Sequence, residues 1–373
     1  MTAGALSGLR VVDLSTVLAG PNCARYLADF GADVIKVERP DGGDSLRNMA
    51  WRDPADGEGL WWRFVNRNKR TVALDLKNPD DANVLMRLLD EADVLVENFR
   101  PGVLERLGFA PEILHARNPR LVITRVTGFG QTGPYAHRPG FATIAEAMSG
   151  LAAITGQPGG EPMLPPIALT DEVTGLVAAF ATMVALWSET GQVVDVSLLE
   201  SIFHLMGPLI SVWLTRGDLQ ERMGSQIPYT VPRGVFQCSD GKWVAMSTSS
   251  DSVAARVVTL LGLEGDARFA TFASRVENRD AMHAAVEKWF ATRTQAEALA
   301  VFEEIEAAAG PVLDMEEIAA DSHYAERGAI VELDGTPMQG LIAKLSATPG
   351  SLRWRGRARD ADGETIRRDG WGS

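Results

Sequence analysis

Asp171 is the clearest candidate in this sequence for a residue that takes part in a chemical reaction. It lies in LTDEVTG, at the start of a segment, Thr174–Trp187, that is apolar on nearly every side and is predicted to form a buried helix. A carboxylate at that point could cap the helix by accepting a backbone N–H. It could instead be a nucleophile, because a carboxylate at a helix N-terminus stays ionised and poor solvation raises its reactivity. The two roles are compatible, and the motif alone does not decide between them.

A glycine-rich segment, Gly128-Phe-Gly130-Gln-Thr-Gly133, matches the dinucleotide-binding pattern letter by letter. Pro134 follows it, and TGPYAHRPGF is predicted to be a loop rather than the start of a helix. Without a helix N-terminus behind the glycines there is no dipole to bind pyrophosphate, so a nicotinamide cofactor is not expected. We interpret the segment as a mobile loop beside a site.

Basic residues form a third group, at or near the ends of predicted strands. A doubly wound sheet gathers its loops at the carboxyl ends of its strands, and arginine suits bidentate phosphate contacts. Scattered solvated charge is the alternative interpretation. We favour a phosphate clamp formed from Arg39, Arg67, Lys69, Arg70, Lys77, Arg100 and Arg106.

The composition restricts the classes of partner. A length of 373 residues favours two domains, and 46% hydrophobic with 23% charged residues is typical of soluble globular proteins. A net charge of -13 argues against nucleic acid and an anionic membrane. The two cysteines and five histidines lie at no metal-ligand spacing, so no metal is expected. We see no apolar run of membrane-spanning length and no signal-peptide pattern, so the expected location is cytoplasmic.

The elements that must position these residues alternate between strand and helix. Strands are predicted at 10–14, 33–38, 71–76, 94–97, 121–126 and 193–197, and helices at 22–30, 79–91, from 103, 144–151, 174–187 and 198–214. This alternation predicts an α/β fold with a large doubly wound, Rossmann-like parallel sheet, whose ligand lies at the carboxyl ends of the strands. The first turn nevertheless lacks the glycine fingerprint of a dinucleotide site.

The alternation of predicted strands and helices ends near Arg216. A hairpin is predicted over Phe236–Met246, with Asp240-Gly241 at its turn, and amphipathic helices follow at 251–261, 280–292 and 294–308. These elements indicate a second, smaller α+β unit. Extended segments at 329–333 and 341–345 then lead into a polar tail.

Several segments together resemble the class III CoA-transferases, the family that also includes formyl-CoA transferase, carnitine CoA-transferase and α-methylacyl-CoA racemase. They are LSGLRVVDLSTVLAGP, GADVIKVERP, NRNKRTVALDLKNP, ADVLVENFRPGVLERLGF, VTGFGQTGPYAHRPGF, DEVTG and GQVVDVSLLE. The resemblance implies a large CoA-binding α/β domain built from residues 1–215 and 328–373, and a small α+β domain with linkers over 216–327. It also implies an interlocked homodimer.

The resemblance also implies roles for individual residues. The family's nucleophilic aspartate falls on Asp171, and coenzyme A is expected as a co-substrate, without metal or nicotinamide. Backbone N–H groups of Gly128, Gly130 and Gly133 are candidates for stabilising an oxyanion. The positions expected to contact CoA are Val17, Leu18, Arg39, Leu74, Lys77, Asn98, Phe99, Arg106, Leu107 and Phe141.

The activity that the resemblance implies is transfer of CoA from an acyl-CoA to a small carboxylic acid, through an aspartyl anhydride and an aspartyl-CoA thioester. The racemase branch carries a His-Asp pair where this chain has Phe141-Ala142. Phenylalanine and alanine cannot act as bases, which favours transfer over racemisation. A racemase-type isomerase and a non-catalytic acyl-CoA-binding protein stay as alternatives.

Overall fold

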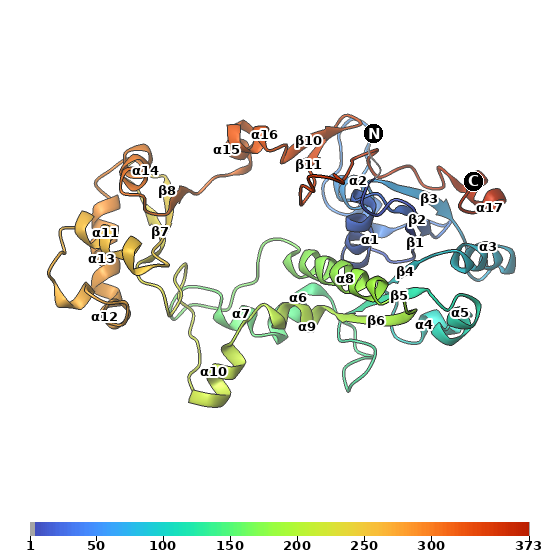
Figure 1. Ribbon diagram of the computed structural model, residues 1–373, viewed down its shortest axis with the longest axis horizontal. Coiled ribbons are helices and arrows are strands. Elements are labelled where there is room, and N and C mark those ends of the chain that lie inside the picture. The colour runs from blue at the N-terminus through green and yellow to red at the C-terminus, as the bar shows by residue number, and fades with distance from the viewer. Residues whose placement is uncertain (1–3, 373) are drawn as a thin grey trace. The chain divides into compact units, whose positions relative to one another are not determined.

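The computed structural model describes residues 4–372, which form two compact units (Figure 1). The first unit comprises Met1–Ala152, Leu164–Ile210 and His323–Ser373, and the second comprises Ala153–Met163 and Ser211–Ser322. The chain therefore leaves the first unit twice, once briefly and once for more than a hundred residues.

A six-stranded sheet forms the centre of the first unit, with strand order β3-β2-β1-β4-β5-β6 and every pairing parallel. Val11 of β1 pairs with Val34 on one side and Val94 on the other, so the order reverses direction between β1 and β4. This arrangement confirms the predicted doubly wound α/β fold. The strands are β1 (Arg10–Asp13), β2 (Asp33–Glu38), β3 (Lys69–Ala73), β4 (Val94–Glu97), β5 (Val122–Thr127) and β6 (Gln192–Ser197).

Helices cover both faces of this sheet. One apolar core joins the sheet to α1 (Ala19–Asp29), α6 (Ala142–Met148), α8 (Leu169–Trp187) and α9 (Leu198–His204). The other core joins it to α3 (Pro79–Asp90), α4 (Val103–Arg106), α5 (Pro111–Arg117) and α17 (Gly363–Asp369). The unit also contains η1 (Ser45–Asn48), α2 (Leu60–Val65) and the hairpin of β10 (Ile330–Leu333) and β11 (Thr336–Gln339).

α8 is the longest helix described, and by length and composition alone it could cross a membrane. A core helix of a soluble protein passes the same test. α8 packs against α1, where a Cβ on Gly175 would lie 2.7 Å from the Asn22 Cβ, so glycine permits the close approach. Its outer side remains apolar and exposed in the single chain, with Phe180 71% and Trp187 90% exposed.

The second unit has its own sheet and core. β7 (Arg233–Gln237) and β8 (Trp243–Ser247) form the predicted hairpin, and β9 (Ala309–Pro311) adds to its edge. Its helices are α11 (Asp251–Leu260), η2 (Ala267–Phe269), α12 (Phe272–Glu277), α13 (Arg279–Phe290), α14 (Gln295–Glu304) and α15 (Met315–Ala320). α7 (Leu151–Ile154), α10 (Leu209–Arg216) and α16 (Ser322–Glu326) cross the boundaries of the units along the chain.

Two predictions of local structure were wrong, and one helix was not predicted. The long helix expected at 198–214 is two helices, because Gly207 (φ 57°) and Pro208 interrupt it. The strand after β10 is Thr336–Gln339, not 341–345. The polar tail contains α17, whose Ile366 is buried against the sheet together with Trp371.

Candidate active site

The turn from β1 into α1 lies at the point where the strand order reverses. It consists of Leu14–Leu18, and it packs so closely on α1 that a Cβ on Gly20 would lie 2.4 Å from the Ser15 Cβ. Glycine is therefore required at position 20 for this contact. In doubly wound sheets, ligands bind at such reversal points.

Two neighbouring cavities open beside this turn. The first, about 480 Å³, lies at the carboxyl ends of β1, β2 and β3, and the second, about 420 Å³, lies beyond β1, β4 and β5 and at the start of α8. Thr16 and Phe99 line both cavities. An elongated ligand could thus extend from one cavity into the other.

Asp171 lines the second cavity and is its only acidic lining residue in the described chain. It is the third residue of α8, whose N-cap position is taken by Ala168, so the interpretation of Asp171 as the helix cap was wrong. Desolvation by burial, followed by the charges of Glu172 and Glu146, raises the pKa of Asp171 from 3.8 to about 6. These effects outweigh the helix dipole, and the carboxylate is still mainly ionised at neutral pH.

The glycine-rich loop reaches the second cavity at one of its three predicted positions. Gly128 lines the cavity, whereas Gly130 and Gly133 line neither cavity. The Gly130 N–H donates to the Thr127 hydroxyl at 3.0 Å and is therefore already used. A Cβ on Gly128 would lie 2.7 Å from the Gly140 Cα, so glycine lets the two ends of the loop meet. The oxyanion role of these glycines stays a prediction.

The residues expected to contact CoA divide between the cavities. Arg39, Leu74, Lys77 and Leu107 line the first, Val17, Leu18, Asn98 and Phe141 line the second, and Phe99 lines both. Arg106, the last residue of α4, lines neither. The structure brings nine of the ten positions to one pair of cavities, and CoA binding by them stays a prediction.

Three members of the predicted phosphate clamp are structural. Arg67 and Lys69 are fully buried, paired with Asp29 at 2.6 Å and Asp13 at 2.9 Å, and Arg70 pairs with Asp33 at 2.6 Å. All three lie before or at the amino end of β3, away from the carboxyl ends where the cavities are. Arg100 instead lines the second cavity, as does Arg138, which was outside the predicted clamp.

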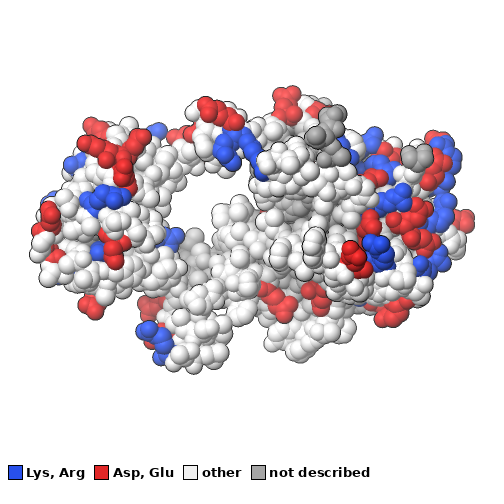
Figure 2. Space-filling model, in the orientation of Figure 1, with Lys and Arg blue, Asp and Glu red and all other residues white. Residues whose placement is uncertain are grey.

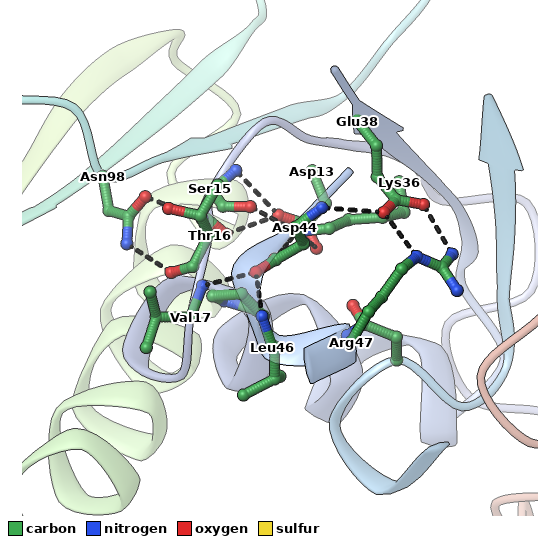
Figure 3. A network of polar contacts seen from close by, with 12 residues as sticks. Asp13, Ser15, Thr16, Val17, Lys36, Glu38, Asp44, Leu46, Arg47 and Asn98 are labelled. Carbon is green, nitrogen blue, oxygen red and sulfur yellow. Dashed lines mark hydrogen bonds and ion pairs between the residues drawn. The ribbon is translucent and has the colours of Figure 1, made fainter. Parts of the chain in front are cut away.

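A buried network of charged residues supports the turn beside the cavities (Figure 3). Lys36 of β2 lies 3.6 Å from Asp13 and 3.2 Å from Asp44, and Lys69 donates to Asp13 at 2.9 Å. All four side chains are almost completely buried, and their formal charges cancel. This network was not predicted from the sequence, although a lysine inside the buried strand segment VIKVE is a signal of a paired internal charge.

Within residues 4–372 there is no group of three or more His, Cys, Asp or Glu side chains placed to hold a metal ion. Both cysteines are buried and free, and burial raises the pKa of the Cys23 thiol to about 12. A thiol with so high a pKa is a poor nucleophile. The cavities therefore offer Asp171 as the clearest nucleophile.

Comparison with known proteins decides the family. The model of CoA-transferase family III matches residues 6–359. The chain belongs to this family. It is 37% identical over 365 residues to a succinyl-CoA–D-citramalate CoA-transferase of Chloroflexus aurantiacus, covering 95% of this chain and 90% of that protein. It is 36% identical over 370 residues to a succinate–glutarate CoA-transferase of Agrobacterium fabrum, covering 94% and 91%.

Solved structures of the family share the fold. A CaiB/BaiF family protein from Brucella suis is 32% identical and superimposes with a TM-score of 0.86, over 98% of this chain and 99% of that chain. Membership of CoA-transferase family III, with named CoA-transferases aligned over nearly the whole chain, identifies the protein as an enzyme that transfers CoA.

Proposed function

We propose that this CoA-transferase moves CoA between two dicarboxylic acids through covalent intermediates on Asp171. The observation that carries the proposal is the position of Asp171, half-buried in the wall of the second cavity and the only acidic lining residue described there. Its carboxylate accepts no hydrogen bond from any described residue. Its lone pairs are therefore available to a substrate carbonyl.

The reaction follows from this carboxylate. An Asp171 oxygen attacks the carbonyl carbon of the donor thioester, the C–S bond breaks, and CoA leaves as a thiolate, so that the donor acyl group and Asp171 are joined as a mixed anhydride. The thiolate then attacks the aspartyl carbonyl, which releases the donor acid and leaves CoA joined to Asp171 as a thioester. The acceptor carboxylate attacks the carbonyl carbon of this thioester, the C–S bond breaks and CoA leaves again as a thiolate, which leaves the acceptor and Asp171 joined as a second mixed anhydride. The returning thiolate attacks the acyl carbonyl of that anhydride, giving the product acyl-CoA and free Asp171.

The two cavities suit the two parts of an acyl-CoA. Arg39 and Lys77 line the first cavity, and their positive charges can bind phosphate groups. Asp171 lies in the second cavity. The lining that the two cavities share at Thr16 and Phe99 gives the pantetheine arm a route between them. This division supports binding of CoA in the first cavity with its sulfur directed toward the second.

Two arginines support dicarboxylic acids as the substrate class. Arg100 and Arg138 line the same cavity as Asp171, and the Arg138 guanidinium carbon lies 4.0 Å from the centroid of the Tyr135 ring. A planar guanidinium held against an aromatic ring is suited to bidentate binding of a carboxylate. A dicarboxylate could place its second carboxylate there. The named acids of the two relatives, citramalate, succinate and glutarate, have this form.

We also propose that a second copy of this chain covers the outer side of α8 and α9. Phe180, Val184 and Trp187 of α8 and Phe203 of α9 are large apolar side chains exposed in the single chain. Figure 2 shows mainly uncharged atoms over α8, whereas charged side chains of the same unit gather over α3 and α17. A contiguous apolar surface of this kind is typical of a subunit interface. The homodimer implied by the family resemblance would bury it.

The mechanism is tested by trapping the intermediates. The chain is incubated with succinyl-CoA, quenched with hydroxylamine and analysed by peptide mass spectrometry. We expect a hydroxamate on Asp171, absent in Asp171→Asn and retained in the neighbouring control Glu172→Gln. Normal CoA transfer by the Asp171→Asn variant would contradict the proposal. So would a wild-type chain that transfers CoA but never forms the hydroxamate.

A further inference from the structure

The turn between β1 and α1 has a backbone conformation that its sequence disfavours. Val17 has φ 67°, in the left-handed region, where a β-branched side chain clashes with its own backbone. Val17 lines the second cavity, and the preceding Thr16 lines both. Backbone strain of this kind persists only where the surrounding structure determines it. The strained residue thus lies where the two cavities meet.

Side chains from β2, from the residue before η1 and from the residue after β4 hold this turn (Figure 3). Asn98, beyond β4, accepts the Thr16 N–H on Oδ1 at 2.8 Å and donates from Nδ2 to the Thr16 carbonyl at 2.7 Å. Asp44 accepts the Val17 N–H on Oδ1 at 3.2 Å, and Lys36 donates to the Ser15 carbonyl. Three consecutive residues are therefore each tied by a polar side chain.

Asp44 is itself fixed from several sides. Its Oδ1 also accepts the Leu46 N–H at 2.9 Å, and its backbone N–H donates to Glu38 at 3.0 Å. Glu38 accepts two hydrogen bonds from Arg47, at 2.7 and 2.8 Å. A buried ion pair such as Lys36–Asp44 contributes little net stability compared with apolar residues of similar volume. Stability of the fold alone is a weak explanation for this arrangement, whereas a fixed turn is its direct geometric result.

We infer that Asp44 and Asn98 are positioning residues for CoA transfer, which hold Thr16 and Val17 in the conformation that joins the two cavities. This inference rests on the proposed reaction at Asp171. The energy they supply offsets the cost of the left-handed Val17. Glycine adopts that conformation without the cost. The need for Asp44 and Asn98 should therefore depend on the residue at position 17.

A double-mutant cycle tests this dependence. The rate of hydroxamate formation on Asp171 from succinyl-CoA is measured for wild type, Asp44→Ala, Val17→Gly and the double variant. We expect Asp44→Ala to slow the reaction about 10- to 100-fold in the Val17 chain and only a few-fold in the Val17→Gly background, since the strain is worth roughly a tenfold effect or more. Asp44→Asn, which keeps an oxygen acceptor, should lie between wild type and Asp44→Ala.

A second double-mutant cycle uses Asn98→Ala in place of Asp44→Ala. Because Asn98 carries no charge, this cycle can still be measured if Asp44→Ala does not fold. The matched control is Asp362→Ala, because Asp362 also accepts a backbone N–H, that of Thr71 at 2.9 Å, and pairs with an arginine, but lines neither cavity. Its effect should be the same in both backgrounds. If Asp44→Ala and Asn98→Ala also act equally in both backgrounds while wild type forms the adduct, the positioning role is wrong and the proposed function stands. A wild-type chain that forms no adduct overturns both.

Discussion

The Thr170 hydroxyl donates a hydrogen bond to Glu146 Oε1 at 3.0 Å, and both side chains are buried. This bond joins α6 to the first turn of α8, one residue before Asp171. It also keeps a second carboxylate close to the proposed nucleophile. The electrostatic setting of Asp171 is thus fixed by the packing of two helices.

The rate of adduct formation should fall as the pH is lowered through about 6. Protonation removes the nucleophilic lone pair of Asp171, whose pKa is raised to about 6 by desolvation, Glu172 and Glu146. Well below that pH the rate should drop about tenfold per pH unit. Glu146→Gln keeps an oxygen acceptor for Thr170 but removes one negative charge, so its midpoint should move to lower pH. A profile with the same midpoint in both chains would contradict this role of Glu146.

Asp171→Asn should make the chain more stable at neutral pH. The pKa of Asp171 is higher in the folded state than its usual 3.8, so the folded chain binds more protons between about pH 4 and 6 and its stability falls as the pH rises through that window. Asparagine removes this cost, about 1–3 kcal/mol after allowance for the partial exposure of the site. Urea unfolding at pH 8 should show the gain, and at pH 4 it should be nearly absent. An equal difference at both pH values would point to a cause other than ionisation.

Arg138→Gln should reduce the use of dicarboxylic acids selectively. Loss of a charge-assisted contact with the second carboxylate is expected to lower kcat/KM for succinate about 10- to 100-fold. The value for butyrate, which lacks that carboxylate, should change little. The same measurements on Arg100→Gln test the other arginine of the cavity. Arg120→Gln serves as a control, because Arg120 lines neither cavity. A uniform loss for both acids in Arg138→Gln would assign Arg138 a general role.

Phe180→Glu should separate the proposed dimer. A charge placed on the apolar side of α8 would have to be desolvated in the interface, at a cost of several kcal/mol. Sedimentation or light scattering should show a dimer for wild type and a monomer for the variant. Ile113→Glu, on α5 and 47% exposed, introduces the same charge elsewhere in the unit and should leave the dimer intact. A monomeric wild type would contradict the proposal directly.

The sheet could be predicted from the sequence because its strands are short apolar runs, separated from the helices by glycine, proline and polar residues. Val94–Glu97 and Asp33–Glu38 were predicted with the bounds found in the structure. Elements whose stability depends on distant contacts were not predictable. α17 is polar in sequence, and only its contact with the sheet, through Ile366 and Trp371, makes it a helix with a buried side.

A site residue was predictable where a single motif contains the chemically active side chain, as LTDEVTG contains Asp171. It was not predictable where the partner of a charge comes from another strand. Lys69 was assigned to a phosphate clamp because the sequence does not show Asp13 opposite it. The left-handed conformation of Val17 left no sign in the sequence, because a β-branched residue is poorly suited to it and only the surrounding contacts impose it.

The four buried charges of Asp13, Asp44, Lys36 and Lys69 cancel inside a volume that water does not reach. Replacing any one of them alone leaves an uncompensated ion in the interior, which costs several kcal/mol. Among descendants of a common ancestor, these four positions should consequently change in pairs of opposite sign or not at all. The turn beside the cavities would then be inherited as a unit with the charges beneath it.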